Sequence, residues 1–374
     1  MKITTGFLIV LSLVPVPILA GGAKTDTLPY FSLEKFEDGI HHWELFSKIR
    51  NYNKLDTNDI FGIADNLLAY QNPDGGWPKN IDWLGILNAD SIKSVMTDRE
   101  KESTFDNRNI YSQVEYLSKV YHYSGNEKYK QSALKGFYYI LENQYENGGW
   151  KGCDADAITF NDEVMTGIMG ILLDIKYDAE WYDWLEEVLR EQLMISYQKA
   201  LSVTLKCQID VHGEKTAWCQ QHDHTTFKPV MARSYELPSI TARESSDIVI
   251  FLMRIRDPGD SIVMAVESAV AWFERVKIEN YVYSRIKIPE VKYHETTVDY
   301  DMVFIPDSTA KPVWARYYDL ENSQPFLCRR DGKIVYKLED IGFERRIGYA
   351  WYGYWPEKVL EKYPEWKMRT SYQH

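Results

Sequence analysis

One short motif occurs twice in the chain, each time at the end of an amphipathic segment. Residues 71–77 and 144–150 both read Gln-x-x-x-Gly-Gly-Trp. Apolar residues recur at helical spacing before each copy, which predicts helices over 58–70 and 129–141. The glycines provide positive φ where a helix stops, and the Trp covers the apolar end of a helix pair. A repeat of this kind predicts helical hairpins arranged around a central axis.

The rest of the chain is also predicted to be mostly helical. Residues 163–175 are apolar almost all round, as in a helix buried on several sides. In residues 281–303 apolar and polar side chains alternate and many are β-branched, which indicates short strands or extended loop. Asp331-Gly332 indicates a hairpin turn. Further helical patterns lie at 110–121, 181–205, 246–255 and 261–276.

The first residues have the layout of a signal peptide. Lys2 precedes the apolar run from Phe7 to Leu19, and small residues follow it. A membrane anchor is the alternative, but two prolines interrupt the run, and an anchor needs about 20 continuous apolar residues. We therefore predict a signal peptide at 1–20, a secreted or periplasmic protein, and a single catalytic domain at 21–374, because no linker divides the remainder.

The formal net charge of −12 argues against a nucleic-acid partner. A polyanionic substrate would need a locally basic groove or a bridging cation. No membrane association is expected once the signal is removed, and a monomer is expected. The four cysteines lack the paired spacing of a zinc site. Cys207 and Cys219 could form a disulfide or remain as buried thiols, and the sequence leaves both open.

Polar clusters interrupt the helices, and the central one runs from Trp218 to Ser239, is closed by Glu244-Ser245 and is predicted to form the active-site wall. Loops of that composition usually carry function on a rigid scaffold. Cys219, His222 and Asp223 lie too close together in the chain to align as a nucleophilic triad. Elsewhere, Asp106, Asn107 and Asp162 offer only hard oxygen ligands, which suit Ca²⁺ or Mg²⁺. Helix N-capping is an equally ordinary role for Asp162.

Eight motifs taken in chain order resemble the pectate lyases of polysaccharide lyase family 10. The resemblance covers about residues 50–368. The motifs are Gly-Gly-Trp-Pro-Lys-Asn-Ile-Asp at 75–82, Thr-Phe-Asp-Asn at 104–107, Asn-Gly-Gly-Trp at 147–150, Ile-Thr-Phe-Asn-Asp at 158–162, Trp-Cys-Gln-Gln-His-Asp at 218–223, Ala-Arg-Ser-Tyr-Glu-Leu-Pro-Ser at 232–239, Trp-Ala-Arg-Tyr-Tyr at 314–318 and Glu-Arg-Arg-Ile-Gly-Tyr-Ala-Trp-Tyr-Gly at 344–353.

The resemblance implies a mainly α fold, an (α/α)3 toroid of α-hairpins whose long irregular loops form the active-site groove. It also implies Ca²⁺-assisted β-elimination of polygalacturonate to 4,5-unsaturated oligogalacturonides. Arg233 would be the base, and Asp162 would bind calcium with Asp106 and Asn107 beside it. The substrate-binding residues implied by the resemblance are Lys79, Asp82, Asp106 and Arg316.

Two departures from the family pattern affect the site. The family usually has Gly-Ala-Thr where this chain has Arg108-Asn109-Ile110, which brings bulk and charge beside the expected calcium. The segment between Trp150 and Ile158 is also short and lacks the family's aromatic run. The Arg108 to Ile110 departure leaves a non-catalytic uronan-binding relative open as an alternative. A glycoside hydrolase that uses two carboxylates on the same scaffold is another alternative.

Overall fold

The structure, a computed structural model, describes residues 29–371. The predicted signal peptide at 1–20 lies outside these residues. The helices are α1 (Glu37–Phe46), α2 (Ile60–Tyr70), α3 (Ala89–Val95), α4 (Asp98–Lys101), α5 (Tyr111–Ser124), α6 (Glu127–Glu142), α7 (Val164–Lys176), α8 (Glu187–Lys206), α9 (Ala242–Met253), α10 (Asp260–Val276), α11 (Phe343–Gly348) and α12 (Trp355–Ser371). Four short 3-10 turns occupy Glu34–Phe36, Asn161–Glu163, Glu180–Tyr182 and Leu338–Asp340.

The strands form small antiparallel sheets. Most are very short, and β6 and β7 are the long exceptions. They are β1 (Ile158–Thr159), β2 (Asp210–Val211), β3 (Glu214–Lys215), β4 (Gln221–His222), β5 (Ile240–Thr241), β6 (Tyr281–Tyr293), β7 (Thr296–Pro306), β8 (Trp314–Ala315), β9 (Tyr317–Tyr318), β10 (Pro325–Cys328), β11 (Ile334–Val335) and β12 (Tyr352–Gly353). One sheet has four strands in the order β11-β10-β9-β5, and the others pair β1 with β4, β12 with β8, β2 with β3, and β6 with β7.

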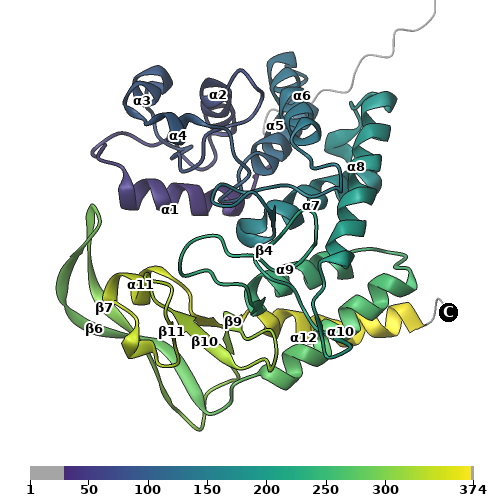
Figure 1. Ribbon diagram of the computed structural model, residues 1–374. Helices are drawn as coiled ribbons and strands as arrows, with labels where there is room; N and C mark the ends of the chain where they lie inside the picture. The colour runs from purple at the N-terminus through teal and green to yellow at the C-terminus, as the bar shows by residue number, and fades with distance from the viewer. Residues whose placement is uncertain (1–28, 372–374) are drawn as a thin grey trace, which may run out of the picture.

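The predicted fold class, a mainly α (α/α)3 toroid, is wrong. The chain is 46% helical and 16% strand, with several small sheets. Most helices from α5 to α10, together with α12, lie on one side, while the β6–β7 hairpin and the β9–β11 strands build the other (Figure 1). The prediction failed because segments predicted to be irregular loops pair with one another as strands. Alternation of apolar and polar residues over such short segments indicates a strand only weakly.

Two helix ends use the repeated motif in the same way. The Trp77 indole donates to the Leu67 carbonyl at 2.7 Å, and the Trp150 indole donates to the Ile140 carbonyl at 2.8 Å. The glycines Gly75 and Gly148 have φ of 93° and 104°, as the turn requires. Each buried Trp thus closes the end of the helix that precedes it.

The Gln at the start of each motif joins the helix before it to a later helix. Gln71 donates to the carbonyl of Ser132 on α6 at 2.9 Å, and Gln144 donates to the carbonyl of Ser196 on α8 at 3.0 Å. Gln208, after α8, donates in the same way to the carbonyl of Ala265 on α10 at 2.9 Å. This third copy lacks the Gly-Gly-Trp sequence, so the repeat did not reveal it. The three Gln side chains link α2, α6, α8 and α10 in succession.

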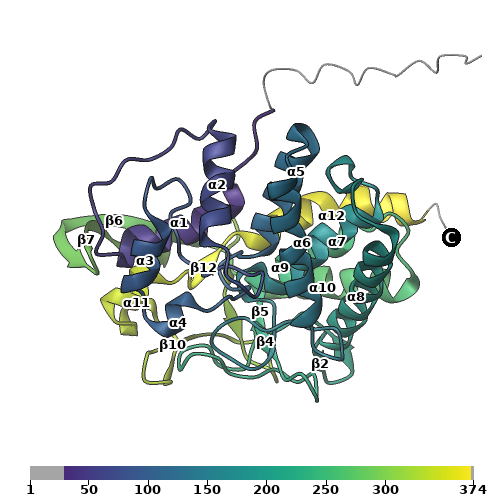
Figure 2. The same ribbon diagram turned by 90° about the horizontal axis from the view of Figure 1, so that it is seen from above.

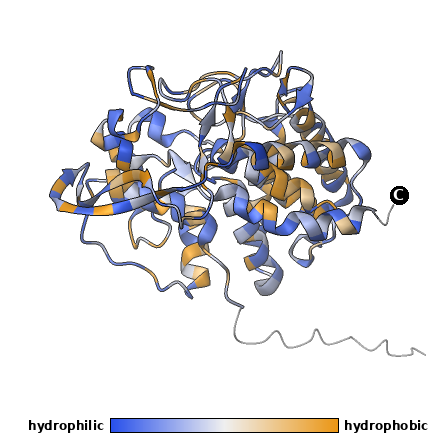
Figure 3. Ribbon diagram, turned by 90° about the horizontal axis from the view of Figure 1, so that it is seen from below, coloured by the Kyte–Doolittle hydropathy of each residue, from blue (hydrophilic) through white to orange (hydrophobic). Residues whose placement is uncertain are grey.

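The predicted all-round burial of the 163–175 helix is confirmed for α7, which packs against α5, α8 and α9. Apolar residues gather on the helical side and hydrophilic residues dominate the surrounding loops (Figure 3). Gly167 allows the close approach of α5, because a Cβ there would lie 2.2 Å from the Tyr111 ring. Viewed from above, α5, α6, α7 and α8 lie near one another (Figure 2).

Three helices in the N-terminal region, α1, α3 and α4, were not predicted. The helix expected from 181 begins only at Glu187, because Glu180–Tyr182 forms a 3-10 turn. The hairpin at Asp331-Gly332 is confirmed, with Cys328 paired to Ile334 across it. Cys207 and Cys219 are both free and buried. None of the described helices has the length and apolarity needed to cross a lipid bilayer.

Candidate active site

Two loops with unusual backbone conformation meet at the starts of α5 and α7. Five residues in them that are not glycine adopt left-handed φ angles: Asn107, Arg108, Ile110, Asp162 and Glu163. The Arg108 amide donates to the Asp162 carbonyl at 3.2 Å, so the loops hold each other. Such conformations cost free energy and persist where the surrounding structure fixes them, commonly at functional sites.

The two loops bring two acidic side chains into one electrostatic environment. Asp106 is 6% exposed and forms an ion pair with Lys79. Asp162 accepts a hydrogen bond from the Asn161 side chain at 2.8 Å. Burial raises the pKa of Asp162 well above its ordinary value, and the nearby carboxylates of Asp106 and Asp38 raise it further. A cation placed beside Asp162 would relieve this unfavourable environment.

The side chains of the two acidic loops fit a hard cation that takes most of its ligands from water and substrate. Within residues 29–371, no three His, Cys, Asp or Glu side chains gather in a way that could hold a metal ion. Asp106 and Asp162 supply carboxylate oxygens. The side-chain NH₂ of Asn107 donates to the side chain of Asn80, so the side-chain oxygen of Asn107 stays available. This donor set suits Ca²⁺ or Mg²⁺ and leaves room for water and substrate oxygens.

Arg233 lies in the loop between β4 and β5, held by a tight turn. The Glu236 amide donates to the Arg233 carbonyl at 2.8 Å, and the Glu236 carboxylate forms an ion pair with the Arg233 guanidinium. The Arg233 side chain is 38% exposed, whereas that of Glu236 is 1% exposed. Burial alone would lower the pKa of Arg233, but Glu236 raises it above the ordinary value. The guanidinium is therefore a cation in this state.

Behind Arg233, a buried network fixes Glu236. The Tyr349 hydroxyl donates to Glu236 at 3.0 Å and contacts the Tyr317 hydroxyl. Tyr317 donates to the side-chain oxygen of Gln220 at 2.9 Å, and Gln220 donates to Glu244 at 3.1 Å. These side chains come from distant parts of the chain. Together they make one rigid wall behind the guanidinium.

Arg316 closes this network toward the acidic loops. Its guanidinium lies 2.6 Å from Glu244 and donates to the Asn161 side chain at 2.9 Å. Asn161 in turn donates to Asp162. A continuous chain of hydrogen bonds therefore joins the Arg233 side of the site to Asp162.

The residues predicted to bind substrate differ in accessibility. Lys79 is partly exposed and lies against Asp106. Arg316 is 3% exposed and already paired with Glu244. Asp82 is 1% exposed, lies 2.9 Å from the Lys54 ammonium and accepts a hydrogen bond from Tyr52 at 2.7 Å. The structure thus brings Lys79 and Asp106 together and places the carboxylate of Asp82 in a separate pairing. The substrate roles of Arg316 and Asp82 remain predictions.

Cys219, His222 and Asp223 do not form a catalytic triad. The His222 ring accepts a hydrogen bond from the Cys219 backbone amide at 2.9 Å and bonds the Phe227 carbonyl at 2.8 Å. Burial raises the pKa of the Cys219 thiol to about 11 and lowers the pKa of His222 to about 4. Asp223 instead caps its own turn by accepting bonds from Thr225 and Thr226. The three residues hold the loop that carries Arg233.

No individual role was predicted from sequence for Glu236, Glu244, Gln220 or Tyr349. Three of them, Gln220, Glu236 and Tyr349, lie within motifs quoted above, and Glu244 follows the motif at 232–239. Their signal was weak because a charged residue among apolar neighbours is as common on a helix surface as in a buried network. His42 and Asp38 on α1 were also missed. The His42 imidazole lies 3.5 Å from the Asp38 carboxylate, and both groups interact with Asp162 over longer range.

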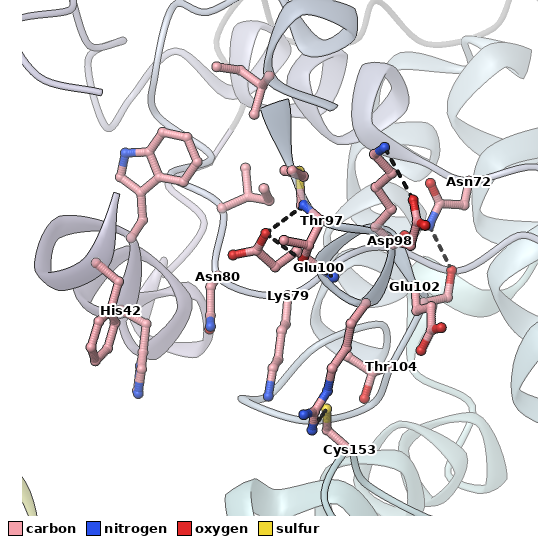
Figure 4. A pocket seen from close by; sticks show the side chains of 18 of the residues that line it. His42, Asn72, Lys79, Asn80, Thr97, Asp98, Glu100, Glu102, Thr104 and Cys153 are labelled. Carbon is pink, nitrogen blue, oxygen red and sulfur yellow. Dashed lines mark hydrogen bonds and ion pairs between the residues drawn. The ribbon is translucent and has the colours of Figure 1, made fainter. Parts of the chain in front are cut away.

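A cavity of about 1300 Å³ opens beside the acidic loops. Its lining includes Lys79, Thr104 and Gly152 near the site, and His42 at the opposite wall (Figure 4). A Cβ at Gly152 would lie 3.1 Å from Asp106, so this end of the cavity borders the acidic pair directly. The site therefore combines desolvated carboxylates, an arginine on a buried support and an adjoining space for a ligand.

Comparisons with known proteins identify the family of this chain. The family described as pectic acid lyase matches residues 71–360. Two solved structures, a family 10 polysaccharide lyase from Cellvibrio cellulosa and a mutant of such a lyase in complex with trigalacturonic acid, align with TM-scores of 0.70 and 26% identity. Each alignment covers 90% of this chain, with 98% and 99% of the respective structures. No curated protein matches significantly. The chain belongs to the pectic acid lyase family.

Proposed function

We propose that this pectate lyase cleaves polygalacturonate by Ca²⁺-assisted β-elimination and releases 4,5-unsaturated oligogalacturonides. The observation that carries the proposal is the meeting of two features in one site. Asp106 and Asp162 form a desolvated acidic pair without a full set of metal ligands. Arg233 is held beside the same buried network. The bound trigalacturonic acid of the related structure supports a uronate substrate.

The reaction removes the C5 proton of a galacturonate and expels the C4 oxygen. That proton is acidic only when the negative charge that grows on the C6 carboxylate is neutralised. Bound Ca²⁺ would supply the neutralising positive charge. Asp106, Asp162 and Asn107 would hold the ion, and Lys79 would contact the uronate from the Asp106 side. Arg233 would take the C5 proton.

Arg233 can act as a base only in the fraction of molecules whose guanidinium is neutral. The Glu236 carboxylate favours the charged form, so this fraction is small and rises with pH. Turnover should therefore increase into the alkaline range. Glu236 also fixes the direction of the guanidinium, which a base needs in order to meet one proton of the substrate.

The Arg108 departure from the family pattern does not argue against catalysis. Arg108 keeps the left-handed conformation that a glycine would adopt, with φ of 59°. Its guanidinium lies 2.7 Å from Glu163, so its charge is neutralised within the loop. Membership of a lyase family also disfavours a glycoside hydrolase. We therefore propose that the enzyme cleaves its substrate by elimination.

We further propose export of the chain, with cleavage after about residue 20, and a single catalytic domain from 21 to 374. Support comes from the charged start and short apolar run of the sequence. Mass spectrometry of protein from the culture medium tests this, because retention of Met1 would contradict it.

The deciding assay follows the ultraviolet absorbance of the unsaturated product from polygalacturonate, with added calcium and with excess chelator. We expect calcium-dependent absorbance. Chain cleavage without absorbance would indicate hydrolysis, and substrate binding without any cleavage would indicate a non-catalytic uronan-binding protein.

A further inference from the structure

The cavity beside Lys79 extends well beyond the acidic pair. Its far side is formed by the C-terminal half of α1 and by α3, with α4 at one edge. Figure 4 shows His42 on one wall, Lys79 and Asn80 in the middle, and Thr97 to Glu102 on the other side. A volume of about 1300 Å³ exceeds what one sugar residue needs. The cavity can therefore hold further residues of the chain being cut.

The far walls of this cavity are apolar. Trp43, Phe46 and Ile49 line it from the α1 side, and Ile92, Val95 and Met96 line it from the α3 side. Phe46 is 49% exposed and Val95 is 72% exposed, and both side chains line the same cavity. A cavity with an apolar lining suits a ligand that carries apolar groups.

The charges lining the cavity are unsuited to a continuous row of ionised uronates. Arg99 lies 2.9 Å from Asp154, and Lys101 lies 3.7 Å from Asp98, so both cations are already paired. Glu102 adds an exposed acidic group at the same edge. An ionised galacturonate in this part of the cavity would meet more carboxylates than available cations.

Two lysines of the cavity have no ion pair within the described residues. Lys151 adjoins Gly152, at the end next to Asp106, and Lys48 follows Phe46 on the α1 side. One cation at the Asp106 end and one beside the apolar α1 side match a substrate that carries both ionised and uncharged residues.

We propose that the apolar walls of this cavity bind methyl-esterified galacturonate residues next to the residue that is cut. The preferred substrate would then be partly esterified pectin. This inference rests on the proposed cleavage of polygalacturonate and adds a specificity to it. The ester removes the carboxylate charge and presents a methyl group to Phe46 and Val95, while the residue at the acidic pair must stay ionised.

The test uses Val95→Lys, which places a cation on the apolar wall at an exposed position outside the catalytic machinery. Val188→Lys is the matched control, since Val188 is 69% exposed on α8 and does not line the cavity. The first measurement maps methyl esters in the products of low-ester pectin by mass spectrometry. Wild type should give esters enriched at one fixed distance from the cut, and Val95→Lys should reduce this enrichment by roughly ten-fold.

The second measurement is calorimetric binding, in calcium, of equal-length oligogalacturonates with and without a single methyl ester; each protein in this comparison also carries Arg233→Lys, so that binding is measured without turnover. Wild type and Val188→Lys should bind the esterified oligomer more tightly, and Val95→Lys should reverse the order. Equal or weaker binding of the ester by wild type, or unchanged preference in Val95→Lys, would overturn the inference. Failure of the proposed reaction would instead appear as a lack of unsaturated product from de-esterified polygalacturonate, whatever the binding order.

Discussion

Arg233 has to satisfy opposing requirements. Its position depends on Glu236, yet the same carboxylate stabilises the charged guanidinium, which is the form that cannot accept a proton. The remaining partners of Glu236 matter for this reason. Tyr349 donates a hydrogen bond to Glu236 and lowers the share of the carboxylate charge that acts on Arg233. Position and protonation of the base are thus set by one small network.

Substitution of Arg233 by Lys separates a base from a substrate anchor. Lys keeps the positive charge but loses the planar guanidinium that Glu236 orients. We expect kcat to fall by at least about a hundred-fold, as for loss of a general base, with little change in KM. Arg330→Lys is the control, because Arg330 also lies over the Tyr235 ring but is paired with Glu344. An Arg233→Lys enzyme with near-normal kcat, or a wild-type optimum in acid, would assign the base elsewhere.

Tyr349→Phe removes one hydroxyl from the network and leaves Arg233 itself unchanged. If Tyr349 positions Glu236, kcat should fall about ten-fold or more while KM for polygalacturonate stays constant. The matched control is Tyr318→Phe, whose buried hydroxyl donates to the Val276 carbonyl outside the network. Equal kinetic effects of the two substitutions, after comparison of their melting temperatures, would show a general packing effect and no positioning role.

At the scale of elements, the loop that carries Arg233 is held by a buried histidine. His222 bonds both Cys219 and Phe227, which requires a neutral ring. Burial lowers its pKa from 6.5 to about 4 in the fold. The unfolded chain therefore binds a proton below about pH 6.5 that the folded chain does not bind. Stability is lost as pH falls from about 6.5 to about 4 and changes no further from this source below that.

A comparison of wild type with His222→Gln tests this pH dependence. Gln can donate and accept hydrogen bonds but does not titrate. The free energy of unfolding of wild type should fall by on the order of 3 kcal/mol more than that of the variant between these pH values. The measurement is urea unfolding across the range. If the free energy of unfolding of the two proteins changed in parallel with pH, a buried neutral His222 would be contradicted.

The connections between helices give a second prediction at this scale. Gln208 donates to the carbonyls of Thr216 and Ala265, both buried bonds. Gln208→Ala removes both buried hydrogen bonds and should lower the free energy of unfolding by about 2 kcal/mol. Gln192→Ala, at an exposed position on α8, should have almost no effect. A Gln208→Ala protein as stable as wild type would mean that the link is dispensable.

Helix positions could be predicted from sequence, because apolar spacing over ten or more residues is a strong signal. The helices α2, α5, α6, α7 and α10 begin and end within a few residues of the predicted limits. The strands could not be predicted in the same way, since two-residue pairings such as β1 with β4 depend on contacts between distant segments. Asp106, Asp162 and Arg233 stood out through their motifs, whereas the support of Arg233 by Tyr349 depends on the tertiary fold.

At the scale of the whole molecule, the site combines groups from most of the chain. The acidic loops precede α5 and α7, Arg233 comes from the segment between β4 and β5, and Tyr349 follows α11. The apolar cavity walls come from α1 and α3, and α1 precedes the part matched by the pectic acid lyase family. Catalysis and the proposed ester specificity thus depend on different parts of one fold.

The last prediction concerns the calcium requirement of the whole enzyme. Within residues 29–371 we assign three calcium ligands, Asp106, Asp162 and Asn107, so calcium should bind weakly without substrate and more tightly with it. Excess chelator should abolish turnover of polygalacturonate. The same chelator should leave the melting temperature of the substrate-free protein nearly unchanged, because a weakly bound ligand adds little to stability.

The calcium requirement should also depend on pH in a fixed direction. The pKa of Asp162 is raised, so the carboxylate holds its proton at a higher pH than an ordinary Asp, and calcium must displace that proton. The calcium concentration for half-maximal activity should therefore increase as pH falls, by up to about ten-fold per pH unit for one displaced proton. Asp162→Asn removes the titrating group, so its residual calcium affinity should be weak and nearly independent of pH. Turnover in chelator, or a wild-type calcium requirement that stays constant with pH, would exclude Asp162 as the calcium ligand.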